Sequence, residues 1–387
     1  MDYFLTEEQK MLKELARRIT EEHVIPLRAE FDEKEEFPWP IMRVCAEVGL
    51  FGVAIPEQYG GSGGGVFETC LVIEELSRGC LGVAVSFAAS SLCAYPIMLF
   101  GTEEQKRKYL PELASGRKLG AFAVTEADAG SDVSSMKTEA IRDGKGYRIR
   151  GTKQWITNGG EADIYVVFAV TDKRRGPRGI SGFIVEKGTP GFSFGKKEKK
   201  MGIRASATRE LIFEDCWVPE ENLLGGREGI GLRAILNTFD MTRPGVGAQA
   251  VGVAQAAFEV ALEYAKQRVQ FGQKIISFQA IQHMLADMAT QIEAARSLVY
   301  AVARYIDSKP PDFTKESAMA KLFASDIAMR VVEDAVQILG GYGYMRDFPV
   351  EKMMRDVKIL QIYEGTNQIQ RNNIARELIK EMAKKGI

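Results

Sequence analysis

The sequence predicts an α+β protein with an all-helical N-terminal domain, a small central β-barrel or sheet domain and a C-terminal four-helix bundle. Helical periodicity fills both ends of the chain, while short runs rich in β-branched and aromatic residues are confined to the middle. This segregated order is typical of α+β rather than alternating α/β proteins. The length of 387 residues exceeds the roughly 250 to 300 at which one core stops growing, so two or three packed units are expected.

The N-terminal helical domain is predicted to cover residues 1–117. Helical periodicity runs from Thr6 to about Leu113, and prolines and glycines mark the joints between helices. The glycine run from Gly60 to Gly65 follows no βαβ pattern, so we interpret it as a flexible loop rather than a dinucleotide-binding fingerprint. The apolar stretch from Leu81 to Gly101 is nearly long enough to cross a bilayer, but serines and a proline interrupt it. A buried helix followed by a break is therefore expected.

The central domain is predicted at residues 118–230 and the C-terminal bundle at residues 231–387. In the central domain, glycine and charged turns separate short strand-like runs, which are Tyr147–Ile149, Ile164–Val170, Phe183–Val185 and Leu211–Phe213. In the C-terminal domain, long amphipathic runs with short connections favour a helix bundle, and they are Val251–Gln267, Gln279–Asp307, Thr314–Leu339 and Asn372–Lys385.

The composition argues against several functions. The formal net charge is -1 and the charges are interspersed, which disfavours nucleic acid as the main partner. Five cysteines in no CxxC pair and only two histidines leave no metal site, HExxH motif or histidine-based triad. The cysteines suit reduced thiols, and the N-terminus begins with helical periodicity rather than a signal or transit pattern. We therefore expect a cytoplasmic protein without a membrane span.

The segment around Glu364 is the strongest candidate for chemistry. Glu364 stands between Tyr363 and Gly365, just before a predicted helix. The glycine allows a ligand to approach the backbone closely, and an apolar neighbourhood from Ile362 and Tyr363 would raise the pKa of the carboxyl group by desolvation. Taken alone, the motif fits equally well with a glutamate that favours a helix N-terminus.

Seven separated motifs occur along the chain, each of them weak by itself. They are Val124-Thr125-Glu126 with Ala129-Gly130-Ser131-Asp132, Trp155-Ile156-Thr157-Asn158-Gly159, Met201-Gly202-Ile203-Arg204, Asp240-Met241-Thr242-Arg243-Pro244, Arg268 with Phe271-Gly272, Gln337-Ile338-Leu339-Gly340-Gly341, and Tyr363-Glu364-Gly365-Thr366. In this order, and with this domain order, the chain resembles the acyl-CoA dehydrogenase family over essentially its whole length.

The resemblance implies FAD as the cofactor. Without their neighbouring motifs, Trp155 would be interpreted as a core tryptophan and Arg268 as a solvated charge. Arg268 and Gln337–Gly341 resemble positions that reach the FAD of a neighbouring subunit, which implies a homo-oligomer and, in this family, a homotetramer. Arginine suits a pyrophosphate because its planar fork binds two oxygens. The implied cofactor-binding residues are Phe122, Val124, Thr125, Gly130, Ser131, Trp155, Thr157, Arg268, Phe271, Gln279, Gln337, Gly340, Gly341, Thr366 and Gln368.

The resemblance also implies the reaction, which is the α,β-dehydrogenation of an acyl-CoA thioester. Glu364 would remove the α-proton while the β-hydride passes to flavin N5, giving a trans-2-enoyl-CoA. The backbone N–H of Glu364 and a flavin ribityl hydroxyl would stabilise the enolate oxygen. The implied substrate-binding residues are Ser131, Asp240, Arg243, Tyr363 and Gly365. Asp240 and Arg243 resemble a CoA-contacting pair, and an ion network at the start of a helix is their alternative interpretation.

The electrons are expected to pass to an electron-transfer flavoprotein. A flavin oxidase of the same fold that passes electrons to oxygen is the main alternative, and oxygen consumption without an acceptor would separate the two. A catalytically silent relative that binds a ligand or nucleic acid is a third possibility. The intact Glu364 and the balanced charge disfavour it.

Departures from the family pattern narrow the substrate. Ala127-Asp128 stands where Pro-Gly is usual, which affects that loop only. A branch of the family places its base near Met241 or Thr242, and neither residue can act as a base. The arginine of the glutaryl-CoA branch is absent between Gly79 and Tyr95, which disfavours a dicarboxylic substrate. The acyl pocket is expected to be lined by Phe87–Tyr95 and Tyr363. Small residues at Ala88–Ser91 leave room in it, and Tyr95 would cap it. This favours a short- to medium-chain, branched or alicyclic acyl-CoA from fatty acid or alicyclic acid degradation.

Overall fold

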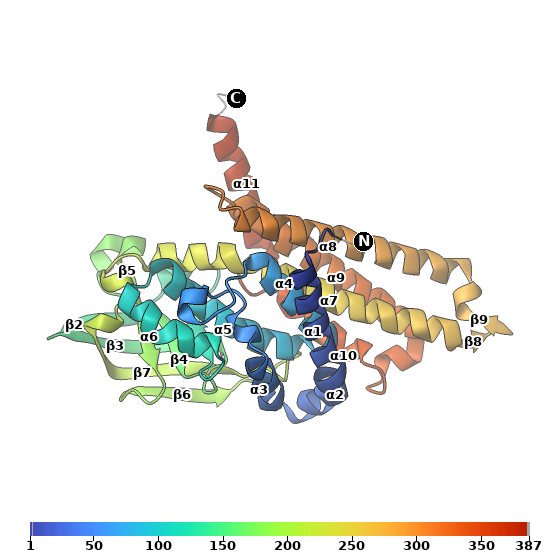
Figure 1. Cartoon of the computed structure of the whole chain (residues 1–387), viewed down its shortest axis with the longest axis horizontal. Helices are drawn as coiled ribbons and strands as arrows, with labels where there is room; N and C mark the ends of the chain where they lie inside the picture. The colour runs from blue at the N-terminus through green and yellow to red at the C-terminus, as the bar shows by residue number, and fades with distance from the viewer. Residues whose placement is uncertain (2, 385–387) are drawn as a thin grey trace.

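The N-terminal part of the protein is a helical layer. The computed structural model describes residue 1 and residues 3–384 (Figure 1). Thr6 and Thr102 begin α1 and α6 with capping boxes, because each hydroxyl accepts the backbone N–H of a glutamine three residues on and that side chain accepts the N–H of the threonine. The helices are α1 (Glu7–Ile19), α2 (Ile25–Lys34), α3 (Trp39–Glu47), α4 (Val66–Gly79), α5 (Leu81–Phe100) and α6 (Glu103–Ala114).

The middle of the chain forms a seven-stranded mixed sheet, at the left of Figure 1. The strand order is β1-β4-β2-β3-β7-β6, and β5 pairs with β4. Only the pairings of β4 with β1 and β2 are parallel. The strands are β1 (Gly120–Ala123), β2 (Glu139–Asp143), β3 (Gly146–Thr157), β4 (Ile164–Val170), β5 (Ile180–Glu186), β6 (Phe192–Lys197) and β7 (Thr208–Pro219).

The C-terminal part is again helical. The 37-residue α7 runs from the sheet to a short hairpin at the opposite end of the molecule, and α8 and α9 pack along it (Figure 1). The last helix packs on α9 and then projects from the body of the molecule. The elements are α7 (Gly231–Gln267), β8 (Val269–Gln270), β9 (Gln273–Lys274), α8 (Gln279–Asp307), α9 (Thr314–Leu339), α10 (Val350–Val357) and α11 (Asn367–Lys384).

The helix–strand–helix order confirms the predicted fold class. The four predicted strands lie within β3, β4, β5 and β7, whereas β1, β2, β6 and α10 were not predicted. Val251–Gln267 is only the C-terminal half of α7. The last predicted helix begins earlier, at Asn367, and its predicted end, Lys385, lies outside the described residues.

The apolar stretch near Leu81 forms a buried helix that ends before Gly101, as predicted. The proline that was expected to interrupt it, Pro96, lies inside the helix instead. Among the described helices, α5 and α7 are long and apolar enough to cross a membrane, but 67% and 72% of their apolar windows are buried inside the protein. Both are therefore core helices by their packing.

Candidate active site

Glu364 lies in a tight turn that leads into α11. Its φ is 52° and that of Gly365 is 90°, so two successive residues have left-handed backbone conformations. Such a conformation is uncommon for a residue with a side chain, and the surrounding structure has to hold it. A Cβ on Gly365 would lie 2.7 Å from Gln370 Nε2, so position 365 requires glycine in both conformation and space.

Three side chains from three helices hold the carbonyl oxygens of this turn. Arg243 Nε of α7 donates to the Glu364 oxygen at 3.2 Å, and Gln370 Nε2 of α11 donates to the Glu364 and Gly365 oxygens at 3.0 and 2.9 Å. Lys321 Nζ of α9 donates to the Gly365 oxygen at 2.8 Å. Both carbonyl oxygens of the turn are therefore held by side chains of the surrounding helices.

The Glu364 carboxylate accepts a hydrogen bond from Thr242 Oγ1 at 2.6 Å. Burial raises the pKa of Glu364, and the Thr242 hydrogen bond, Arg243 and Lys321 oppose that rise. The direction agrees with the desolvation effect predicted from the sequence, but Ile362, which was expected to contribute to it, is 48% exposed. A carboxylate with a raised pKa is a stronger base than an exposed glutamate, as a general base at neutral pH requires.

A cavity of about 30 Å³ adjoins this carboxylate between α4, α5 and α7. This is about the volume of one water molecule. Its walls are largely apolar, and Tyr95 lines it from the α5 side. The lining residues are Val66, Thr69, Ile73, Ala88, Ser91, Leu92, Tyr95, Met241, Thr242, Gly245, Val246, Gln249 and Glu364.

Only some of the residues predicted to line the acyl pocket lie at this cavity. Ala88, Ser91 and Tyr95 line the cavity, but Phe87 packs against Phe51 and Ser90 Oγ accepts the Gly120 N–H at 3.0 Å. Because helix α5 presents only one face to the cavity, the intervening residues pack inside the protein. Tyr363 is hydrogen-bonded to Gln249, which lines the cavity, and does not line it itself.

Asp240 and Arg243 form an ion pair beneath the turn. Arg243 is only 3% exposed, and Asp240 also accepts a hydrogen bond from Thr314 Oγ1 at 2.7 Å. Arg243 therefore already supports the Glu364 backbone. Contact of this pair with CoA stays a prediction, and the ion network that was its alternative is present.

The predicted flavin segment leaves the end of β1 and is held by β3. Lys153 Nζ donates to the Val124 oxygen at 3.0 Å and to Glu126 Oε1 at 2.8 Å, and the Gln154 N–H donates to the Thr125 oxygen at 2.8 Å. Burial lowers the pKa of Lys153 to about 8. Burial alone would raise the pKa of Glu126, but Lys153 and neighbouring hydrogen bonds lower it overall, so the pair is charged at neutral pH.

The residues of this segment fit a flavin nucleotide. Trp155 sits at an irregularity between β3 and β7 with φ 56°, and its indole is 55% exposed. Within the described part of the chain, the hydroxyls of Thr125, Ser131 and Thr157 have no side-chain hydrogen bond, and the space beside Gly130 is open. An exposed ring beside unpaired hydroxyls suits an aromatic ring that carries polar hydroxyl and phosphate groups.

The strand that leads into the predicted flavin segment contacts α7 close to the Glu364 site. The Phe122 ring at the end of β1 contacts the Phe239 ring of α7 at a centroid distance of 5.7 Å. Phe239 lies one turn before Thr242 and Arg243, the two residues that contact Glu364. Thr366 and Gln368, two further predicted FAD contacts, lie at the start of α11, and the Thr366 hydroxyl accepts the Ile369 N–H at 3.2 Å.

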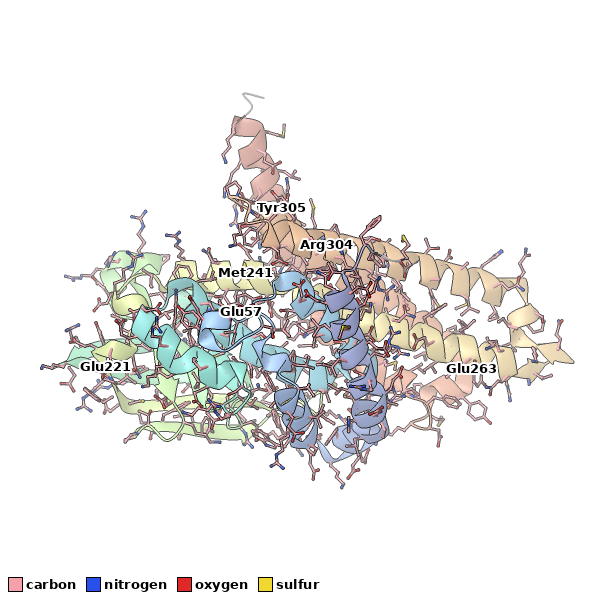
Figure 2. The ribbon with its side chains drawn as sticks, in the orientation of Figure 1. Glu57, Glu221, Met241, Glu263, Arg304 and Tyr305 are labelled. Carbon is pink, nitrogen blue, oxygen red and sulfur yellow. The ribbon has the colours of Figure 1, made fainter. Side chains whose placement is uncertain are left out.

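A second group of predicted FAD contacts lies at the other end of α7. Figure 2 labels Met241, which lines the same cavity as Glu364, and Glu263 toward the opposite end of α7, where Arg268 follows the helix. At 1.5 Å per residue, Arg268 stands roughly 40 Å along the axis from Arg243. Phe271 is 94% exposed, and the rest of the group is exposed as well: Arg268, Gln279, Gln337, Gly340 and Gly341. The chain by itself does not bring this group to the Glu364 site.

Several site residues were not predicted from the sequence. From the sequence, Thr242 was named only as a position where a branch of the family places its base. No role was predicted for Lys321, Gln370, Lys153 or Gln249. All but Gln370 contact residues far away in the sequence, such as Thr242 and Glu364, which are 122 positions apart. A polar residue within an apolar helix or strand gives a local signal, but that signal does not identify its partner.

Comparisons with known proteins agree with this arrangement. Sequence models of the acyl-CoA dehydrogenase N-terminal, middle and C-terminal domains match residues 6–117, 121–216 and 229–379. Two curated relatives cover 98% of the chain. One is an acryloyl-CoA reductase (NADH) of Anaerotignum propionicum, 48% identical over 96% of its length, and the other is a short-chain specific acyl-CoA dehydrogenase of Clostridium acetobutylicum, 47% identical over its whole length.

Solved structures share the fold over 98% of the chain. Butyryl-CoA dehydrogenase from Megasphaera elsdenii superimposes with a TM-score of 0.95 at 49% identity and is covered over its full length. A chain from a structural study of the electron transferring flavoprotein of Acidaminococcus fermentans gives a TM-score of 0.95 at 51% identity, with 99% of that chain covered.

The fold and the site define a flavoprotein oxidoreductase that binds FAD and acts on acyl-CoA thioesters. The chain belongs to the acyl-CoA dehydrogenase family, with all three of the family's domains present.

Proposed function

We propose that the chain oxidises a short straight-chain acyl-CoA to its 2-enoyl-CoA, with Glu364 as the base. The observation that supports this most strongly is the desolvated Glu364 carboxylate, which adjoins a small apolar cavity from a turn whose carbonyl oxygens are held by side chains of the surrounding helices. The α-C–H bond breaks, its proton moves to a Glu364 carboxylate oxygen, and its electron pair forms the new C=C bond as the β-hydride leaves.

Bound FAD would supply the hydride acceptor. We propose that the Val124–Ser131 segment, Trp155 and Thr157 hold its ring and phosphates, with Thr366 and Gln368 from the start of α11. The backbone N–H of Glu364 is the proposed donor to the thioester oxygen, where negative charge develops as the proton leaves. The apolar cavity wall excludes water from the reacting carbons, which strengthens these electrostatic interactions.

The small size of the cavity favours a short acyl group. Tyr95 of α5 and Thr69 of α4 both line it. The names of the relatives, short-chain specific acyl-CoA dehydrogenase and butyryl-CoA dehydrogenase, support the same choice. We therefore propose a butyryl-sized substrate over the branched, alicyclic or longer acyl groups that the sequence left open.

The experiment is an anaerobic titration of the flavin absorption band with straight, branched and alicyclic acyl-CoAs. Butyryl-CoA should bleach the band most completely, and Tyr95→Ala should extend bleaching to longer chains. Full bleaching by long or alicyclic substrates in the unmodified protein would overturn the proposed substrate. Bleaching by none of them would overturn the proposed reaction.

We propose an electron-transfer flavoprotein as the electron acceptor, because a chain from such a structural study is 51% identical to this one. The same reduced enzyme should reoxidise with that flavoprotein and only slowly with oxygen. Fast oxygen consumption would identify the oxidase alternative. Since one relative is an acryloyl-CoA reductase, the reverse direction, reduction of an enoyl-CoA by the reduced enzyme, is the second candidate and is measured in the same assay.

A further inference from the structure

Lys321 is a fully buried lysine behind the catalytic turn. It lies on α9 with 0% exposure, and its ammonium donates to the Gly365 oxygen at 2.8 Å and to Asn367 Oδ1 at 2.7 Å. No carboxylate of the described residues lies within ion-pair distance of it. Lysine is almost never fully buried unless its charge is compensated, so packing alone does not account for a lysine at position 321.

The hydrogen bonds around Asn367 determine which of its amide atoms faces Lys321. Asn367 Nδ2 donates to Ser325 Oγ at 2.9 Å and to Asp326 Oδ1 at 2.8 Å, which leaves its amide oxygen facing Lys321. Lys321, Ser325 and Asp326 come from neighbouring turns of the same helix face. Helix α9 therefore holds both the end of the turn, at Gly365, and the first residue of α11.

Two cations approach the turn from different helices. Arg243 of α7 binds the Glu364 oxygen, and Lys321 of α9 binds the Gly365 oxygen. Of the two, Arg243 has an ion-pair partner in Asp240, whereas the charge of Lys321 is opposed only over a longer range by Glu364 and Asp326. Glu364 is therefore one of the two carboxylates on which the charge of Lys321 acts.

We propose that Lys321 is a positioning residue for Glu364: it fixes the left-handed turn through the Gly365 oxygen, and its positive charge favours the carboxylate form of the base. The proposal rests on the proposed role of Glu364 in proton removal. Burial lowers the pKa of Lys321 to about 7, Glu364 and Asp326 act to raise it, and Arg243 acts to lower it. Below neutral pH the lysine therefore carries its charge.

The direction of the change in the pKa of Glu364 follows from the interaction that is lost. Removing the cation takes away one of the interactions that oppose the raised pKa of Glu364, so the pKa rises further and the base is protonated at a higher pH. The loss of the Gly365 hydrogen bond also loosens the turn. Both effects slow proton removal most strongly on the acid side.

The test compares Lys321→Met and Lys321→Arg with the unmodified holoenzyme, using the rate of flavin reduction by butyryl-CoA over a range of pH. Lys321→Met should be slower by about ten- to a hundredfold, with its acid limb displaced to higher pH, and Lys321→Arg should restore the limb. Hydrogen exchange of the backbone amides at residues 365–367 gives a readout independent of activity and should accelerate in Lys321→Met alone.

Lys352→Met is the matched control. Lys352 is a second buried lysine, 7% exposed, on α10 and paired with Asp356, and its loss should lower the melting temperature without moving the acid limb. If Lys321→Met fails to fold, Lys321→Gln replaces it in the same comparison. An unchanged limb and unchanged exchange in the Lys321 variant, or an equal displacement in Lys352→Met, would overturn the proposal. If Glu364→Gln reacts as fast as the unmodified enzyme, the proposed function fails instead.

Discussion

At the residue scale, the basicity of Glu364 reflects burial opposed by a few donors. Burial raises the pKa of its carboxyl group, whereas Thr242, Arg243 and Lys321 lower it. A base acts only when it is deprotonated, so any further rise reduces activity at low pH and leaves it unchanged at high pH. Substitution of Thr242, Arg243 or Lys321 should therefore displace the acid limb of the pH profile of flavin reduction.

Thr242→Val removes the hydroxyl that donates to the carboxylate at 2.6 Å. A hydrogen bond to a charged group contributes about 1.5 to 3 kcal/mol, so its loss should raise the pKa of Glu364 further. The acid limb of the flavin-reduction rate would move up by the same amount. Thr238→Val is the control, because its buried hydroxyl has no partner among the described residues. Equal displacement in both variants would contradict a direct role for Thr242.

Gly365→Ala places a side chain where φ is 90° and where the new Cβ lies 2.7 Å from Gln370 Nε2. We expect a loss of about 1 to 3 kcal/mol in the free energy of unfolding, together with slower flavin reduction, because the turn must shift. Gly188→Ala, at φ 88° in open space, measures the backbone contribution alone. A Gly365 variant no less stable than the Gly188 variant, with an unchanged rate, would show that the turn is more tolerant than its geometry indicates.

At the element scale, β3 positions the predicted flavin segment through one buried lysine. Lys153→Met leaves the Glu126 carboxylate without its ion-pair partner and frees the Val124 oxygen. Removing one partner of a buried pair costs about 3 to 5 kcal/mol, so the melting temperature and the fraction of bound FAD should both fall. Lys153→Met combined with Glu126→Gln should recover stability in part. Full FAD content in the single variant would show that this pair does not position the segment.

The elements also show what sequence patterns can predict. The predicted bounds of α8 and α9 match the structure because both are long amphipathic helices with a persistent 3.6-residue period. Strand β1 was missed because its four residues are all buried and have no alternating pattern. The motif around Glu364 indicated the base, but its left-handed backbone and the contact with Lys321, 44 positions from Gly365, depend on tertiary packing.

At the scale of the whole molecule, the two groups of predicted FAD contacts stand at opposite ends of α7. Because this helix separates Arg243 from Arg268 by roughly 40 Å, a single chain cannot direct both groups at one flavin. We therefore propose a homo-oligomer, a tetramer by resemblance to the family, in which Arg268 of one chain completes the FAD site of another. Exposed Phe271 and its neighbours would be covered in that assembly.

Mixed oligomers test this shared site. Glu364→Gln and Arg268→Ala chains should each be nearly inactive alone, and coexpressing them should restore activity. In a mixed pair, the Arg268→Ala chain keeps Glu364 and receives an intact Arg268 from its neighbour. Tagged and untagged chains allow the mixed species to be purified. No recovery in the mixed oligomer would place all contacts of each site within one chain.

The central claim is that the Glu364 carboxylate removes the α-proton. The most direct measurement is the anaerobic single-turnover rate of flavin reduction by butyryl-CoA in the unmodified protein and in Glu364→Gln, at equal FAD content. The carboxamide keeps the size of the side chain but accepts no proton, so the rate should fall by about a hundred- to ten-thousandfold while FAD and substrate still bind. A Glu364→Gln variant that reduces its flavin at an undiminished rate would contradict the account.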